Sequence, residues 1–193
     1  MKAVRFKDNP VIHQALHAEI GDNINGASLI RVPDWVKNPL ARYYLYFAHH
    51  KGRYIRMAYA DNIEGPWLIH KPGVLNVNET QFVKEDITSP IEAKGSWAKA
   101  TGGQFLYAHV ASPDVHVDEK DQKILMYYHG LLEDGEQKTR LAVSDDGLTF
   151  SSLEPLLGTP YFRAFAYQQY IYAFAWGGAL FRAAHLQGPF ELE

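Results

Sequence analysis

The sequence predicts an all-β fold built from repeated four-stranded antiparallel units. The chain contains short runs rich in aromatic and β-branched residues, and these runs are bounded by Gly, Pro, Asn and Asp, as is typical of antiparallel strands. Helical periodicity is weak along the whole chain. A turn that contains glycine and ends on an aromatic residue occurs three times, at 60–67, 144–150 and 184–190.

The three turns divide the chain into three similar units, at about 26–70, 109–150 and 160–192. A four-stranded meander of about 45 residues has the size of one β-propeller blade. We therefore expect a β-propeller-like array in a single domain, 1–193. The expected strands are 27–32, 43–48, 54–60 and 67–70 in the first unit, 114–117, 124–129, 139–144 and 149–150 in the second, and 161–165, 170–175, 179–184 and 190–192 in the third.

The turn of the second unit, residues 144–150, fits the Asp-box pattern Ser-x-Asp-x-Gly-x-Thr-aromatic, with Gly147 following Asp146 directly. In such a turn Asp146 accepts hydrogen bonds from turn amides, and Gly147 supplies a positive φ. The pattern predicts a structural role for both residues.

A longer connection separates the first two units, at about 71–105. We interpret it as a loop-rich insertion, and loops of this length in compact domains are often functional. A degenerate fourth blade is the alternative interpretation of the same segment.

Composition excludes several classes of protein. The formal net charge is −3 and the pI is about 6.3, which argues against a nucleic-acid partner. The chain has no cysteine, so disulfides and thiolate sites are excluded. The N-terminal residues lack an apolar segment, and no stretch approaches the roughly 18 apolar residues of a membrane span. We therefore expect a cytoplasmic protein without a membrane partner.

Several segments together resemble the five-bladed β-propellers of glycoside hydrolase family 43. They are the two turns ending in Gly-Pro-aromatic, 65–67 and 188–190, the strands 28–32 and 43–48, and the segment 111–115. The resemblance extends over most of the chain, blade by blade. It implies a carbohydrate ligand in a pocket on the propeller axis, although this chain has room for only three blades and a possible fourth.

The resemblance also implies a set of acidic residues. Family members cleave with inversion, using an Asp base, a Glu acid and a second Asp that orients the acid; inverting carboxyl groups lie roughly 6.5–9.5 Å apart. Asp114 matches the second-blade Asp, with a turn cap after Pro113 as the alternative role. The first-blade Asp is missing, and Asp22 is the nearest substitute for the base. The third-blade Glu is missing too, and Glu154, expected on the incoming loop, is the substitute for the acid.

Other polar and aromatic residues are candidates for binding the sugar. His49, His116 and His129 are expected to bond sugar hydroxyls. Their spacing matches no metal signature, so we expect no metal or other cofactor, with a structural divalent ion at the axis as an alternative. Arg163 is expected in the axial pocket, unless it pairs with a local carboxylate. The remaining candidates, expected to stack on sugar rings from loops, are Trp35 and Trp97.

Two functional hypotheses follow from these residues. In the first, the protein is glycoside-hydrolase-like and acts on the glycosidic bond of a carbohydrate in the axial pocket. In the second, it is a non-catalytic propeller that binds carbohydrate or another subunit and has lost the catalytic acids. Three blades leave open faces, so we expect two chains to close the ring as a homodimer. The alternative is that residues 71–105 fold back over the open face.

Overall fold

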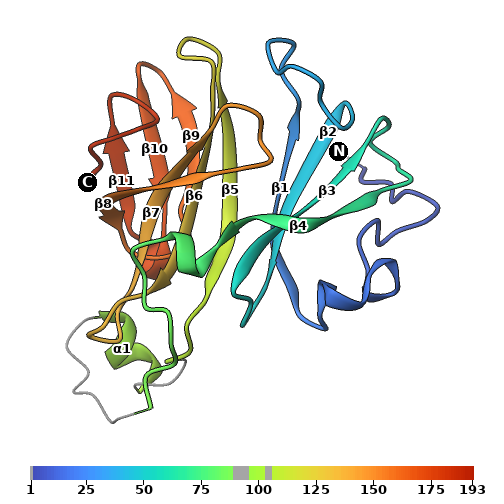
Figure 1. The fold of residues 1–193 in the computed structure, drawn as a ribbon. Coiled ribbons are helices and arrows are strands. Elements are labelled where there is room, and N and C mark those ends of the chain that lie inside the picture. The colour runs from blue at the N-terminus through green and yellow to red at the C-terminus, as the bar shows by residue number, and fades with distance from the viewer. Residues whose placement is uncertain (1, 89–95, 103–105) are drawn as a thin grey trace.

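The computed structural model describes residues 2–88, 96–102 and 106–193. These residues form three four-stranded antiparallel sheets, each a meander in chain order. Figure 1 shows the sheets arranged side by side, with α1 near one end of the strands. The first sheet comprises β1 (Ile24–Arg31), β2 (Tyr43–His49), β3 (Tyr54–Ala60) and β4 (Leu68–Asn76). The second comprises β5 (Val110–Asp118), β6 (Lys123–Leu131), β7 (Gln137–Ser144) and β8 (Ser151–Gly158), and the third comprises β9 (Arg163–Tyr167), β10 (Tyr170–Phe174), β11 (Leu180–Ala183) and β12 (Glu191–Leu192).

Helical structure is scarce in the described residues. The α-helix α1 covers Ser96–Thr101, and the 3-10 turns are η1 (Gln14–Leu16), η2 (Ala18–Ile20), η3 (Val77–Glu79) and η4 (Trp176–Gly178). The all-β class and the repeated four-stranded meander are therefore confirmed. No helix among these elements is long and apolar enough to cross a membrane.

Several predicted strand positions were wrong by a few residues. The fourth strand of the second sheet starts at Ser151, after the predicted 149–150, because Phe150 is buried and its backbone N–H donates to the carbonyl of Val74 (3.1 Å). Phe150 thereby joins the first two sheets before pairing with β7 begins. The strand β4 continues to Asn76, so the first residues of the predicted insertion belong to the first sheet.

The described part of the insertion forms η3 and α1 and adds no fourth sheet. Phe82 from this segment is buried in the core between the first two sheets. Residues 89–95 and 103–105 of the predicted insertion lie outside the described residues.

The sheets pack face to face through two apolar cores. One core lies between the first and second sheets and includes Tyr46, Met57 and Met126. The other lies between the second and third sheets and includes Tyr127, Ala173 and Phe181. Each sheet buries one face on its neighbour, which accounts for the aromatic and aliphatic content of the strands.

The Asp-box turn has the predicted contacts. The Oδ1 atom of Asp146 accepts hydrogen bonds from the backbone N–H groups of Leu148 (2.8 Å) and Thr149 (3.1 Å), and Gly147 has a φ of 76°. The hydroxyl of Tyr46 donates to the carbonyl of Gly147 (2.9 Å), so the turn is also attached to the first sheet. Its role in the fold is structural.

The outer face of the first sheet is covered by the N-terminal segment. Ile20 is fully buried against Phe47 and Trp67, and further apolar residues of 11–20 pack beside it. This segment, which we call the N-terminal strap (residues 11–20), closes much of a sheet face that would otherwise be apolar and exposed.

Candidate functional site

The first strand of each sheet begins with the same irregularity. In the first sheet Asn25 pairs with Ala48 and Ser28 pairs with Tyr46, so β1 has one residue more than β2 between the two pairs. Such an extra residue is a β-bulge, which turns the strand and redirects its side chains.

The other two sheets repeat this bulge. In the second sheet the two pairs are Ala111 with His129 and Asp114 with Tyr127. In the third sheet Arg163 pairs with Phe174, and the N–H of Trp176 donates to the carbonyl of Pro160 (2.8 Å). The registers make three residues equivalent, one from each sheet: Ser28, Asp114 and Arg163.

The residue that opens each bulge has a left-handed backbone. The φ angles are 63° at Gly26, 51° at Ser112 and 67° at Tyr161. Glycine adopts this conformation without strain, whereas serine and tyrosine do so at a cost of about 1–3 kcal/mol. Strain of this kind persists where the surrounding structure holds it, and here it recurs at one position in all three sheets.

The bulges bring the first strands of neighbouring sheets into contact. The N–H of Val115 donates to the hydroxyl oxygen of Ser28 (2.8 Å), and the N–H of Ala164 donates to Oδ2 of Asp114 (2.7 Å). In each case the side chain at the bulge of one sheet accepts a hydrogen bond from a backbone N–H of the next sheet. The donor is the residue that directly follows that sheet's own bulge residue, Asp114 or Arg163. The strands β1, β5 and β9 therefore converge on a common axis.

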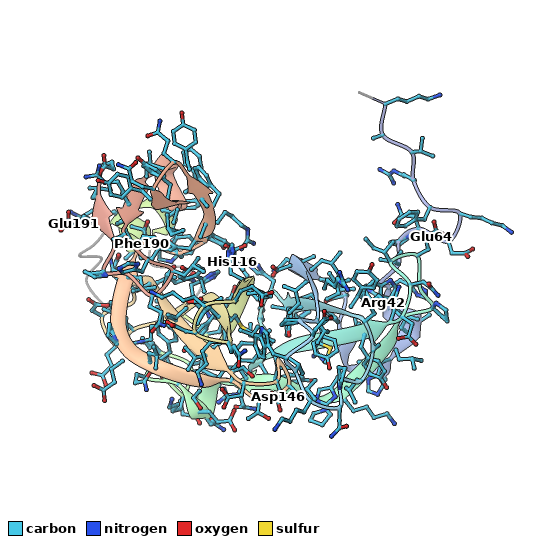
Figure 2. All side chains as sticks on the ribbon, turned by 90° about the horizontal axis from the view of Figure 1, so that it is seen from above. Arg42, Glu64, His116, Asp146, Phe190 and Glu191 are labelled. Carbon is cyan, nitrogen blue, oxygen red and sulfur yellow. The ribbon has the colours of Figure 1, made fainter. Side chains whose placement is uncertain are left out.

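Figure 2 shows the resulting arrangement from above. The three sheets form an arc, and His116 lies on its inner side. The ring of His116 is hydrogen-bonded through Nε2 to Oδ2 of Asp114 (2.9 Å), as expected for residues two apart on one face of a strand. Both side chains are largely buried, with exposed fractions of 14% for Asp114 and 24% for His116. Asp114 lies within β5 rather than in a turn after Pro113.

Arg163 was expected either to face the axial pocket or to pair with a local carboxylate, but its hydrogen bonds within the described residues are to backbone carbonyls. Its Nη1 atom donates to the carbonyl oxygens of Ser112 (3.2 Å), Pro113 (3.2 Å) and Phe162 (3.0 Å). The guanidinium therefore binds the backbone of the neighbouring bulge. It is the third sheet's counterpart to the acceptors Ser28 and Asp114, but it can only donate hydrogen bonds.

The predicted base substitute, Asp22, lies before β1 and pairs with a histidine. Its Oδ1 atom is 3.1 Å from Nε2 of His49, at the end of β2, and the Asp22 side chain is 87% exposed. The hydrogen bond with His49 lowers the pKa of Asp22, so this carboxylate stays ionised at neutral pH.

The predicted acid substitute, Glu154, lies on the outside of the second sheet. It is an exposed residue of β8, not of an incoming loop as predicted. The order of this sheet is β5-β6-β7-β8, so Glu154 is three strand spacings from the strand of Asp114. At about 4.8 Å per spacing the strands lie roughly 14 Å apart. The structure does not bring Glu154 together with Asp114.

A row of aromatic and imidazole rings crosses the end of the sheets at which β1, β5 and β9 begin. We call this end the α1 end, because Trp97 of α1 contacts the row. Successive ring centroids lie 4.4–6.3 Å apart along the row. Its members, in order, are His50, Tyr107, His109, His129, Tyr161 and Trp176. The row joins all three sheets.

His129 is the buried centre of this row. Burial lowers its pKa well below the usual value, and the neighbouring His109 and Arg163 lower it further. The imidazole is therefore neutral at pH 7. Its Nδ1 atom is buried and has no hydrogen-bond partner among the described residues. An unpaired buried nitrogen costs about 1–3 kcal/mol.

The exposed part of the row borders a hollow of about 360 Å³. Tyr161, Arg163, Phe174 and Trp176 are among its lining residues, and Trp176 is 39% exposed. The hollow thus combines aromatic ring faces with one guanidinium. It lies at the bulge of the third sheet.

The tryptophans predicted to stack on sugar are placed less favourably. Trp97 is buried behind Trp176, with their ring centroids 4.8 Å apart. Trp35 follows β1, at the opposite end of the strands from the α1 end, and its indole N–H donates to Glu119 (2.9 Å). The exposed Trp176 was not selected from the sequence. Its position in the repeat could have identified it. Trp176 follows Phe174 by two residues, as His129 follows Tyr127 in the second unit.

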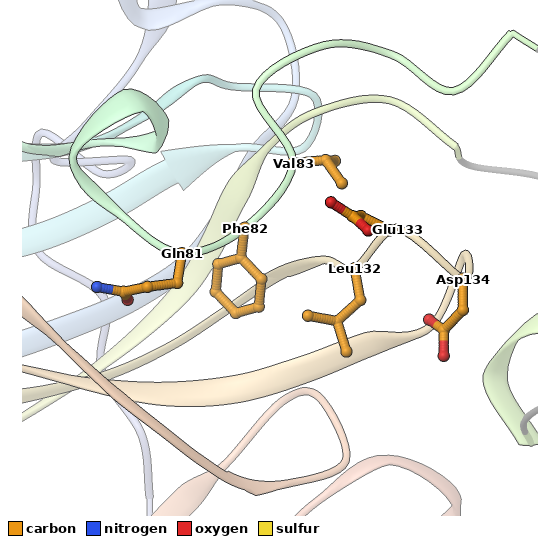
Figure 3. Close-up of a pocket in the computed structure, with 6 residues that line it drawn as sticks. All are labelled: Gln81, Phe82, Val83, Leu132, Glu133 and Asp134. Atoms are coloured by element: carbon orange, nitrogen blue, oxygen red, sulfur yellow. The ribbon is translucent and has the colours of Figure 1, made fainter.

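A second hollow, of about 410 Å³, lies between the insertion and the turn after β6 (Figure 3). It is lined by Gln81, Phe82, Val83, Leu132, Glu133 and Asp134. Phe82 is only 3% exposed, so this hollow offers little aromatic surface for a ligand. Its polar lining is mainly acidic, and none of the predicted site residues belongs to it.

Metal binding has no support from side-chain geometry. Within residues 2–88, 96–102 and 106–193, no group of three or more His, Asp or Glu side chains is arranged to hold a metal ion.

The fold and its axial arrangement define a β-propeller-like protein with the fold of glycoside hydrolases. A family 43 enzyme from Xanthomonas citri matches with a TM-score of 0.58 and 14% identity, over 88% of this chain and 55% of the enzyme. An α-L-arabinofuranosidase from Clostridium thermocellum matches with a TM-score of 0.52 and 17% identity, over 87% of this chain and 50% of that one. At these identities the likeness concerns the fold.

Comparison of sequences adds one relative. The uncharacterized protein R118 of Acanthamoeba polyphaga mimivirus is 28% identical over 193 aligned positions, which cover 93% of this chain and 50% of that protein. No family model matches the chain. The chain spans about half the length of R118 and of the two enzymes above.

Proposed function

We propose that this glycoside-hydrolase-like chain binds a carbohydrate at the α1 end, in the hollow beside Tyr161, Arg163 and Trp176. The observation that carries the proposal is the pairing of exposed ring faces with a guanidinium in one concave site. Aromatic faces stack on the apolar faces of sugar rings, and a few polar groups fix the orientation of a ligand. The guanidinium donates to hydroxyl or carboxylate oxygens.

His129 supports a ligand rich in hydroxyl groups at this end. Its unpaired Nδ1 atom lies in a ring that is 4.4 Å from the Tyr161 ring, and Tyr161 lines the hollow. A hydroxyl group that reached this nitrogen would remove the cost of leaving it unpaired. Sugars provide such groups at high density.

The axial residues favour binding over hydrolysis. Inversion requires two carboxyl groups on opposite sides of the scissile bond. The three equivalent bulge positions hold one carboxylate, Asp114, together with Ser28 and Arg163. One oxygen of Asp114 is already bonded to the N–H of Ala164 and to His116. If the protein hydrolysed the sugar, Asp114 would have the role of orienting the acid. Asp22, at the α1 end, would then be the remaining predicted carboxylate.

Titration calorimetry with arabinose-containing oligosaccharides tests the binding proposal. The ligand class comes from the arabinofuranosidase that shares this fold. We expect Trp176→Ala to weaken binding about tenfold, or about 1.4 kcal/mol, because the exposed stacking surface is lost. Trp35→Ala is the matched control and should leave affinity unchanged, since Trp35 lies at the opposite end. Equal affinities of wild type and Trp176→Ala would contradict the proposed site.

The hydrolysis alternative has its own readout in the same samples. Release of 4-nitrophenol from 4-nitrophenyl α-L-arabinofuranoside is measured for the wild type, Asp114→Asn and Asp22→Asn. Wild-type turnover no higher than that of Asp114→Asn and of Asp22→Asn supports a binding protein. Turnover that is lost in either variant would overturn the binding proposal in favour of hydrolysis.

A further inference from the structure

The outer face of the third sheet is a patch of aromatic side chains. The strand register places Phe165 opposite Tyr172 and Tyr167 opposite Tyr170, and the ring of Phe165 stacks on those of Tyr172 and Phe174, with centroids 5.9 and 5.7 Å away. These five residues alternate with Ala164 and Ala173, which pack against the second sheet. We call this surface the aromatic face (Phe165, Tyr167, Tyr170, Tyr172 and Phe174).

The aromatic face is large enough to mark an interaction surface. Tyr167 is 59% exposed, Phe174 is 53% exposed and Phe165 is 41% exposed. At roughly 150–250 Å² per aromatic side chain, these three rings present on the order of 300 Å². That is less than half of the ~800 Å² that each partner buries in a standard interface. It lies at the lower end of the ~300–600 Å² range of the largest patch on a typical monomer, which is often functional.

The opposite end of the arc is partly covered by the chain itself. The N-terminal strap covers the outer face of the first sheet, where Ile20 packs against Phe47 and Trp67. The first and third sheets therefore differ: one has its own cover, and the other leaves its rings exposed.

The contact that joins consecutive sheets also ends at the third sheet. It requires an acceptor side chain at the bulge, which Ser28 and Asp114 provide. Arg163 has no acceptor atom, so it offers nothing to the N–H that follows Ser28 in another copy of the first sheet. If the first sheet of a second copy packed on the third sheet and continued the arc, this hydrogen bond would therefore be missing.

We propose that the aromatic face docks the same face of a second copy of this chain, forming a two-fold dimer. An isologous contact brings the same residues together from both sides, so an aromatic surface is complementary to itself. Of the two arginines at this face, Arg182 pairs with Glu193 (2.8 Å) and lies over the ring of Tyr170 (4.7 Å from its centroid), and Arg163, opposite Phe174, donates to backbone carbonyls of the second sheet. Phe174 belongs to both the aromatic face and the hollow, so the partner lies beside the proposed carbohydrate site.

Light scattering of the purified chain tests this dimer. The monomer mass is 21.9 kDa, and we expect about 44 kDa for the wild type at micromolar concentration. Phe165→Lys and Tyr167→Lys should each give about 22 kDa, because each places two like charges in the interface. A circular dichroism spectrum typical of β-sheet, as in the wild type, shows that a variant is folded, and Tyr167, the more exposed of the two, serves if Phe165→Lys fails to fold.

Leu29→Lys is the matched control. Leu29 is 42% exposed and lies on the first sheet, so this variant should stay at about 44 kDa. A wild type that stays at about 22 kDa when concentrated would overturn the proposal. Dissociation by Leu29→Lys would overturn it too, because the first sheet would then be part of the interface. Carbohydrate binding is measured separately with Trp176→Ala, which changes a residue outside the aromatic face, so failure of one proposal is distinguishable from failure of the other.

Discussion

Asp114 connects the second and third sheets as well as facing the axis. Its Oδ2 atom accepts the N–H of Ala164 and contacts the ring of His116. The side chain is largely buried, so the N–H of Ala164 has no ready replacement for this acceptor. A residue selected as a catalytic candidate is therefore also part of the framework.

We expect Asp114→Ala to lower the free energy of unfolding by about 1–3 kcal/mol, because a buried N–H loses its acceptor. Asp114→Asn retains an amide oxygen in the same place and should lose less. Urea denaturation followed by fluorescence measures both. Equal losses for the two variants would mean that the charge of Asp114, rather than its acceptor oxygen, carries the contact.

The bulge at the start of β1, β5 and β9 is the element that builds the axial site. It places Ser28, Asp114 and Arg163 in equivalent positions and lets neighbouring first strands approach closely. The approach is close at Gly26, where an added Cβ would lie 2.5 Å from the Cα atom of Ser112. Glycine at this position satisfies both the positive φ and the short distance.

Gly26→Ala should therefore destabilise the protein more than an alanine placed at another glycine with a similar φ. Gly177 is the matched control: its φ is 75° against 63° for Gly26, and a Cβ there would meet no atom within 4 Å. Gly177→Ala should cost about 1 kcal/mol from the backbone alone, and Gly26→Ala should cost at least twice as much. Thermal or urea unfolding compares them. A similar loss in both variants would show that β1 and β5 move apart freely.

At the scale of the whole molecule, three sheets form an arc rather than a closed ring (Figure 2). Its two ends differ, since the N-terminal strap covers one and the aromatic face is exposed at the other. The row of rings at the α1 end spans the arc, and its central histidines are deeply buried. Protonation of these histidines should therefore affect the stability of the whole fold.

The stability of the molecule should fall as the pH is lowered below neutrality. Burial lowers the pKa values of His109 and His129, and that of His70 as well, below the usual value of 6.5. Between pH 6.5 and those lowered values the unfolded chain binds more protons than the folded one. This contribution is therefore complete above pH 6.5 and is lost below it, by up to about 1.4 kcal/mol per pH unit for each of the two deeply buried imidazoles, His109 and His129.

Urea denaturation between pH 8 and pH 5 measures this loss. His129→Gln should reduce the slope below pH 6.5, because the most strongly shifted imidazole is gone, and its curve should run parallel to the wild type above pH 7.5. Asp22 and Asp146 have lowered pKa values and contribute only at more acidic pH. A wild-type stability that stays constant down to pH 5 would contradict the assignment of neutral buried histidines.

The all-β class, the three four-stranded meanders and the Asp-box turn could all be predicted from the sequence. Each depends on local signals: strand-forming residues, the turn residues between them and the hydrogen bonds of a few adjacent amides. The alternation of side chains along a strand also determined that Asp114 and His116 share one face. Such features need no knowledge of what lies across the sheet.

Which side chains meet could be seen only in the folded chain. Glu154 is far from Asp114 because its segment became the outermost strand of the sheet, while Tyr161 and Trp176 reached the hollow through a bulge. Pairing across sheets depends on register, and one extra residue in a strand redirects every side chain around it. Packing of one sheet on the next then brought Arg163 to the backbone of the second sheet's bulge rather than to a carboxylate.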